Sequence, residues 1–141
     1  MKKVVVDASV AAKWFIPEVH SDSAAHLLDS ELVLLAPDLI GAEFGNILWK
    51  KLRRAEITKK EAAAILNAFA ALPLEIHPSA ALLTAAFHIA VSLDRTVYDS
   101  LYLALAAAEN CVLVTADARF HDAVRRSALA DHIEWIEPGE A

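Results

Sequence analysis

Cysteine, glycine and proline are all scarce in this chain of 141 residues. Cys111 is the one cysteine, so no disulfide can form within the chain and nothing points to an oxidising compartment. Three glycines and five prolines are too few for a β-sandwich or for an array of modules joined by linkers. Hydrophobic residues make up 57% of the sequence, which is too apolar for a disordered chain. We therefore expect one folded domain spanning residues 1–141.

Charged residues are absent from residues 76–93. Pro78, three hydroxyl side chains and two histidines make this stretch a poor membrane span, and a well-buried amphipathic helix fits it better. The apolar run near the N-terminus stops at Asp7, which is not the pattern of a signal peptide. We therefore expect a soluble, cytoplasmic protein that does not enter a membrane.

The net charge is −6, which is not typical of a nucleic-acid-binding protein. Net charge discriminates weakly here, because acids that surround metal ions lower it without repelling a phosphate. The six histidines form no close pair at metal-ligand spacing, so we do not expect a zinc site. No glycine-rich phosphate loop is present, which argues against nucleotide hydrolysis of the P-loop kind.

Short apolar runs alternate with helical patterns along the chain. The patterns predict strands at 3–7, 32–36, 74–77, 111–115 and 133–136, and helices at 8–16, 21–29, 38–54, 58–72, 79–93, 99–109 and 120–127. Thr58 and Glu61 have the spacing of a capping box at the start of one helix. This alternation is typical of an α/β fold in which helices cover both faces of a parallel sheet. Functional residues of such folds gather beyond the carboxyl ends of the strands.

Four acidic residues fall where this fold would bring them to one edge of the sheet. Asp7 and Asp117 lie at or just past strand ends, where Asp7 also suits an Asx-turn and Asp117 also suits a helix cap. Asp99 opens a predicted helix, where a cap is its plain structural role. Glu43 instead lies inside a helix on a mostly apolar face, where a carboxylate costs several kcal/mol unless a metal ion or a buried basic group compensates.

Four carboxylates in one pocket repel one another unless cations lie among them. Ligands that are all oxygen favour Mg²⁺ or Mn²⁺ over zinc. Two such ions can activate a water, orient a phosphodiester and stabilise the leaving oxygen. Water is the expected nucleophile, since no serine or cysteine is placed for covalent chemistry.

Four segments of the chain resemble the motifs of PIN-domain ribonucleases, in the same order and at the same spacing. They are VVVDAS, PDLIGAEFGNILWK, TVYDSLYLALA and LVTADARF. The compact size resembles the VapC toxins of bacterial and archaeal toxin–antitoxin pairs. The resemblance implies a sheet of about five strands in the order 3-2-1-4-5, a homodimer, and inhibition by an antitoxin whose tail crosses the active site.

The same resemblance assigns roles to individual residues. The acids that would hold Mg²⁺ or Mn²⁺ are Asp7, Glu43, Asp99 and Asp117. The residues that would support them are Ser9, Thr115 and Asn46. We refer to the four acids below as the acidic quartet.

Basic and aromatic residues suggest further contacts. The run 50–60, KKLRRAEITKK, holds six basic residues and is either a solvated helix end or a contact for an RNA backbone. Lys50 shares the face of Glu43, and Lys13 and Arg119 lie close in sequence to quartet acids, so these three are candidates for phosphate contact. Three aromatic residues are expected mainly in the core: Trp14, Phe15 and Trp49.

Alternative functions differ in what they need from the sequence. A phospho-receiver module would need an acid pair at 6–7, an aspartate after the third strand and a lysine after the fifth. The chain has Val6-Asp7, His77-Pro78 and Glu137-Pro138 at these places, so that reading fails. We expect a Mg²⁺-dependent endoribonuclease that acts as a toxin. A PIN-domain nuclease of RNA maturation or decay stays open, and a non-catalytic Mg²⁺-binding signalling module is less favoured.

Overall fold

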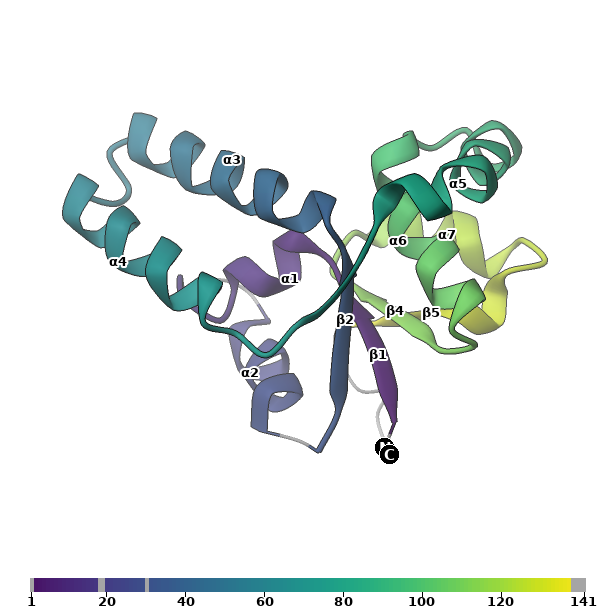
Figure 1. Cartoon of the computed structure of the whole chain (residues 1–141), viewed down its shortest axis with the longest axis horizontal. Coiled ribbons are helices and arrows are strands. Elements are labelled where there is room, and N and C mark those ends of the chain that lie inside the picture. The colour runs from purple at the N-terminus through teal and green to yellow at the C-terminus, as the bar shows by residue number, and fades with distance from the viewer. Residues whose placement is uncertain (1, 18–19, 30, 138–141) are drawn as a thin grey trace.

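The computed structural model describes residues 2–17, 20–29 and 31–137 of the chain. Within them, five parallel strands form one sheet in the order β3-β2-β1-β4-β5 (Figure 1). The strands are β1 (Lys3–Val6), β2 (Val33–Pro37), β3 (Glu75–His77), β4 (Val112–Thr115) and β5 (Ile133–Trp135). The order 3-2-1-4-5 and the parallel α/β architecture predicted from the sequence are therefore confirmed.

Seven helices and one 3₁₀ turn surround the sheet in the described part of the chain. They are α1 (Ala8–Ala12), α2 (Ser21–Asp29), α3 (Leu39–Arg53), α4 (Lys59–Ala70), α5 (Ser79–Leu93), α6 (Val97–Ala108), α7 (Ala118–Arg125) and the 3₁₀ turn Ala130–His132. In Figure 1, α3 and α4 lie side by side to the left of the sheet, whereas α5, α6 and α7 lie to its right. The quartet-bearing helices α3 and α6 both contribute residues to the main core cluster.

The three central strands β1, β2 and β4 are buried on both faces, which explains why they are continuous apolar runs rather than alternating ones. On one face, Val5, Leu35 and Leu113 are neighbours across three strands and pack in the main core, which also includes residues of α3 and α6. On the other face, Val4 and Val6 belong to a second cluster that includes parts of α1 and α2. The central strands β1 and β4 are therefore firmly held, and so are the residues that follow them.

Side-chain caps begin several helices where the sequence suggests. Thr58 and Glu61 form the predicted capping box of α4, with hydrogen bonds of 3.1 and 3.0 Å. The cap that was the alternative structural role for Asp99 is supplied by Thr96, which accepts a hydrogen bond from the Asp99 backbone N–H at 3.1 Å. Asp99 instead lies in the first turn, so its carboxylate is not used as a cap.

The helix predicted at 8–16 ends at Ala12. The chain then turns, and Trp14 donates a hydrogen bond from Nε1 to the carbonyl oxygen of Ala24 at 2.7 Å. Trp14 and Phe15 pack against the core, as predicted. Tertiary packing of these two rings, rather than helix propensity, decides where α1 ends.

Helices α3 and α4 contact one another through stacked phenylalanines. The rings of Phe44 on α3 and Phe69 on α4 lie 4.0 Å apart with an interplanar angle of 10°. Phe44 is fully buried, whereas no residue of α4 is fully buried. The α4 helix therefore depends on a small contact area.

Two expectations about burial are wrong. The helix α5 is not well buried, because Leu82 and Ala86 are its buried residues whereas Leu83, Phe87 and Val91 are more than half exposed. Trp49 is 50% exposed rather than in the core, because it lies on the outer face of α3. Among the described residues, no single helix is long and apolar enough to cross a membrane, and the α5–α6 pair that passes together by composition is bent by 115°.

Candidate active site

The acidic quartet gathers at the carboxyl edge of the sheet. Asp7 follows β1 and Asp117 follows β4, which are neighbouring strands. A cavity of about 200 Å³ beside them is lined by Asp7, Glu43 and Asp99. The charges of the other three acids all act on the Asp7 carboxyl, so the four groups lie within electrostatic reach of one another. The structure therefore brings together the acids that the sequence singled out.

Asp7 is the most strongly perturbed of these acids. Its Oδ1 accepts a hydrogen bond of 2.8 Å from the Val10 N–H and so caps α1, whereas the structural role expected for it was a turn after the strand. Burial raises the pKa of the Asp7 carboxyl from 3.8 to about 7, and the charges of Glu43, Asp99 and Asp117 add to the increase. The folded protein therefore holds this carboxylate at a cost that a nearby cation would remove.

Glu43 is held from the opposite side of the cavity. The Tyr102 hydroxyl, on α6, donates a hydrogen bond of 2.6 Å to its Oε1. Burial raises the pKa of Glu43 and the charge of Asp99 adds to this, while the Tyr102 hydrogen bond acts in the opposite direction. The desolvation expected from the apolar face around Glu43 is thus present, and a neutral hydroxyl supplies part of the compensation.

Arg95 supplies positive charge to the other two acids. One of its terminal nitrogens, Nη2, donates to Asp99 Oδ2 at 3.1 Å and to Asp117 Oδ2 at 3.0 Å. Its guanidinium also lies over the ring of Phe120, with the central carbon 5.0 Å from the ring centroid. Its buried Nε has no hydrogen-bond partner within the described residues. Arg95 therefore joins the first turn of α6 to the N-terminus of α7.

The residues predicted to support the quartet lie at varied distances from it. Ser9 and Asn46 line the same cavity as the acids, and so does Lys50. Thr115 is fully buried and its hydroxyl accepts a hydrogen bond of 3.1 Å from the Asp117 N–H. Thr115 thereby fixes the turn on which Asp117 caps α7. Lys13 and Arg119 line none of the cavities described here: Lys13 is half-buried after α1, and Arg119 is exposed on α7.

Sequence reasoning missed Arg95 and gave Tyr102 no role. Arg95 stands four residues before Asp99, the spacing at which opposite charges pair in helical segments, so this signal was present. Tyr102 lies three residues after Asp99, on the same side of α6. Nothing in the linear sequence indicates that its hydroxyl reaches Glu43, which is 59 positions away.

The donor set of the cavity fits a hard divalent cation. Its acidic ligands are carboxylates, with a serine hydroxyl and an asparagine amide nearby, and these oxygen ligands suit Mg²⁺ or Mn²⁺. Burial raises the pKa values of Asp7 and Glu43 and the neighbouring acids add to it, so a cation in the cavity would favour their charged forms. Within the described residues, the ion pairs of Arg95 are with Asp99 and Asp117.

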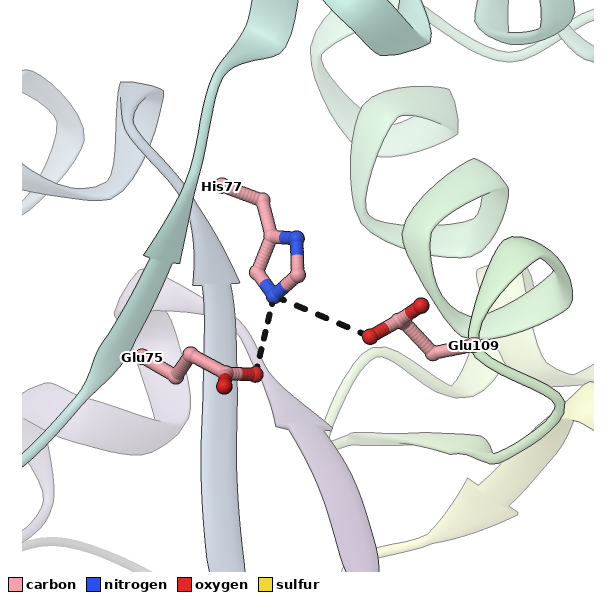
Figure 2. A group of neighbouring side chains, drawn as sticks. All are labelled: Glu75, His77 and Glu109. Atoms are coloured by element: carbon pink, nitrogen blue, oxygen red, sulfur yellow. Dashed lines mark hydrogen bonds and ion pairs between the residues drawn. The ribbon is translucent and has the colours of Figure 1, made fainter.

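A second group with metal-ligand chemistry lies elsewhere in the fold. Figure 2 shows Glu75 and His77 of β3 pointing towards Glu109 at the end of α6. The His77 Nε2 atom lies 3.0 Å from Glu75 and 3.9 Å from Glu109, and the three ligand groups are close enough to share an ion. The sequence analysis expected no such histidine cluster. Because the Lys3 ammonium lies 3.2 Å from Glu109, a metal ion would have to displace it.

Comparisons with known proteins agree with this architecture. The family described as PIN domain matches residues 4–125. The chain therefore belongs to the PIN domain family. Ribonuclease VapC3 of Pyrobaculum aerophilum is 36% identical to it over 117 residues, which cover 82% of this chain and 89% of that protein. The resemblance to VapC-type PIN domains that was noted from the sequence is confirmed.

Solved structures share the fold. The crystal structure of PAE2754 from Pyrobaculum aerophilum has a TM-score of 0.65 and 26% identity, and covers 86% of this chain and 79% of that one. VapBC2 from Rickettsia felis, bound to a DNA fragment from their promoter, has a TM-score of 0.65 and 20% identity, and covers 94% and 98%. The second of these likenesses concerns the fold alone.

Proposed function

We propose that this chain is a Mg²⁺-dependent endoribonuclease and the toxin of a toxin–antitoxin pair. The observation that carries the proposal is that Asp7, Glu43 and Asp99 line one small cavity at the carboxyl edge of the sheet. Asp117 lies beside them, because its charge acts on the Asp7 carboxyl and it shares Arg95 with Asp99. Membership of the PIN domain family and a relative named Ribonuclease VapC3 support it.

In this proposal the quartet holds the ion, Mg²⁺ or Mn²⁺. When bound, such an ion lowers the pKa of a water molecule and neutralises charge on the phosphate. Tyr102 keeps Glu43 aimed into the cavity, because its hydroxyl fixes one carboxylate oxygen. Arg95 keeps Asp99 and Asp117 together, and Thr115 fixes the turn before Asp117. Lys50, which lines the same cavity, is the basic group nearest to the place for a scissile phosphate.

The test is cleavage of single-stranded RNA by the purified chain, free of antitoxin. We expect cleavage with Mg²⁺ or Mn²⁺, none with excess EDTA, and none from Asp99→Asn in either condition. Asp131→Asn is the matched control, because it removes one exposed carboxylate outside the cavity. Undiminished cleavage in EDTA, or equal loss of activity in the control, would contradict the metal mechanism.

The proposal includes two partners. An antitoxin partner is supported by the fold that this chain shares with VapBC2 of Rickettsia felis, which was solved bound to a DNA fragment from their promoter. A second copy of this chain is supported by α5, where Leu83, Phe87 and Val91 recur every four residues and are exposed. RNA and an antitoxin are both cytoplasmic molecules, so the proposed function implies that this protein acts in the cytoplasm.

A further inference from the structure

Basic and aromatic side chains continue along α3 from the acid cavity to the end of the helix. A cavity of about 150 Å³ is lined by Ser9, Lys50 and Arg54, among others. A wider one, of about 350 Å³, is lined by Trp49, Lys50, Arg53 and Arg54. Lys50 lines both of these cavities and the acid cavity as well. The three hollows are therefore neighbours that meet at Lys50, and we refer to the surface from the acid cavity past them as the path.

Helical spacing explains why the path runs straight. Glu43, Lys50 and Arg54 follow one another at intervals of seven and four residues, which keeps them on one face of α3. Trp49 and Arg53 are one helical turn apart on the adjacent face. From Glu43 to Arg53 the helix rises about 15 Å at 1.5 Å per residue. A stacked single strand advances about 3.4 Å per nucleotide, so this path has the length of about four nucleotides.

Trp49 offers a surface for a nucleic-acid base. Half of this residue is exposed, and the Arg53 guanidinium lies 4.9 Å from its ring centroid. The core has no need of a large ring at this position, since the neighbouring Leu48 fills the buried side of α3. Exposed aromatic rings and arginine planes are the groups on which single-stranded bases stack.

The charges along the path are available to a phosphate. In the described part of the chain, Lys50, Arg53 and Arg54 form no ion pair with an acidic side chain. Lys51, by contrast, forms an ion pair with Glu56, with its Nζ 3.8 Å from Oε2. The dipole at the C-terminal end of α3 favours cations there in any protein. That dipole explains neither the exposed Trp49 nor the position of Lys50 in the lining of both the acid cavity and the two neighbouring hollows.

We propose that Trp49, Lys50, Arg53 and Arg54 form a track that binds the single-stranded RNA on one side of the scissile phosphate. The track begins at Lys50, where the acid cavity ends, and Trp49 stacks on a base while the arginines contact phosphates. This inference rests on the proposed ribonuclease function and adds the surface that holds its substrate. The inference assigns only the first part of the basic run 50–60 to RNA binding, because Lys59 and Lys60 start α4 and line none of the three cavities.

The experiment uses the full chain and a labelled single-stranded RNA. Trp49→Ala removes the ring, and Trp49→Phe restores one. Leu66→Ala, on α4 and 46% exposed, is the control for loss of a surface apolar group. An Arg53→Gln and Arg54→Gln double variant is matched by Lys59→Gln with Lys60→Gln, which removes the same charge from the same run. Cleavage is measured in Mg²⁺, and binding is measured on an Asp99→Asn background by fluorescence anisotropy over a series of salt concentrations.

We expect Trp49→Ala to raise KM and weaken binding by roughly 5- to 100-fold, with kcat little changed, because stacking holds the strand but does no chemistry. Trp49→Phe should recover most of this loss, and Leu66→Ala should show none. The arginine pair should lower the slope of log affinity against log salt by about 1.4, since each lost phosphate contact removes about 0.7. The lysine pair should leave that slope unchanged.

Three results would overturn the track. The first is unchanged KM, affinity and salt slope in the Trp49 and arginine variants, and the second is an equal effect of the lysine pair. The third is unchanged RNA binding together with weaker inhibition by an antitoxin, which would mean that this surface binds an antitoxin peptide rather than RNA. If the wild type cleaves no RNA in Mg²⁺ or Mn²⁺, the proposed function fails, and the binding measurements still decide whether the track exists.

Discussion

Replacing Asp7 by Asn should make the metal-free protein more stable at neutral pH, even though it removes a proposed metal ligand. Asn keeps an oxygen that can accept the 2.8 Å hydrogen bond from the Val10 N–H, so the cap of α1 survives. What the substitution removes is a carboxyl group whose pKa burial has raised from 3.8 to about 7. The folded state holds the charged form of this group at a cost that the unfolded state does not have.

The size of the effect follows from the shift in pKa. A rise of about three units corresponds to about 4 kcal/mol at 1.36 kcal/mol per unit. Asp7 keeps partial contact with solvent, which screens part of this cost, so we expect a gain of about 2–3 kcal/mol in the free energy of unfolding. Such a gain would raise the melting temperature by roughly 5–10 °C in a domain of this size.

The sign of the pH dependence is fixed by the direction of the shift. Below pH 3.8 the carboxyl is protonated in both states, so wild type and Asp7→Asn should be similar in stability. Between pH 3.8 and about 7 the unfolded chain loses this proton first, so the wild type loses stability as pH rises. Above about pH 7 both states are ionised, and the difference between the proteins stops growing.

The assay is urea unfolding in EDTA from about pH 4 to about pH 8, repeated in Mg²⁺, with Asp131→Asn as control. In EDTA, Asp7→Asn should gain on the wild type as pH rises, and the control should not. Mg²⁺ should reverse the gain, because an ion that binds only the folded wild type stabilises it by mass action. A difference that is the same at both ends of the pH range would refute the electrostatic reasoning.

Three further predictions concern groups around the site and on the surface. Tyr102→Phe should raise the pKa of Glu43 further, because Glu43 then loses a hydrogen bond that lowers this pKa, and the acid limb of the pH–rate profile should move to higher pH. If the acid limb does not move, Tyr102 has a packing role only. Arg95→Gln should lower the metal-free melting temperature, because Asp99 and Asp117 lose their shared cation. Mg²⁺ should then raise the melting temperature of this variant more than that of the wild type, and equal shifts would count against this role of Arg95. Phe87→Asp should turn a dimer into a monomer in light scattering while Thr84→Asp on the same helix has a smaller effect, and equal masses for both would refute the proposed interface.

Local sequence patterns predict much of the fold. The β-branched run of β1 and the helix limits of α5 are read directly from the sequence, and the capping box of α4 follows from Thr58 and Glu61. The edge on which Asp7 and Asp117 meet follows from parallel strands, whose carboxyl ends share one side of the sheet.

Other features depend on contacts that no local pattern specifies. The exposure of Trp49 and of α5 could not be predicted, because a chain rich in apolar residues does not say which of its apolar faces the fold leaves uncovered. The hydrogen bond from Tyr102 to Glu43 joins two helices that are far apart in sequence. Arg95 had a signal in its spacing from Asp99, but its second partner, Asp117, comes from another strand end.

The small contact area of α4 has a consequence for motion. No residue of α4 is fully buried, and its ring stack of Phe69 on Phe44 is its closest link to α3. Segments with few buried contacts open locally at a lower free energy than the whole domain unfolds. Amide hydrogens of α4 should therefore exchange faster than those of β1 and β4, whose strands are covered on both faces. When α4 opens, Phe44 loses its contact with Phe69. The helix α3, which carries Glu43 and Lys50, is then held less firmly than the other elements that line the cavity.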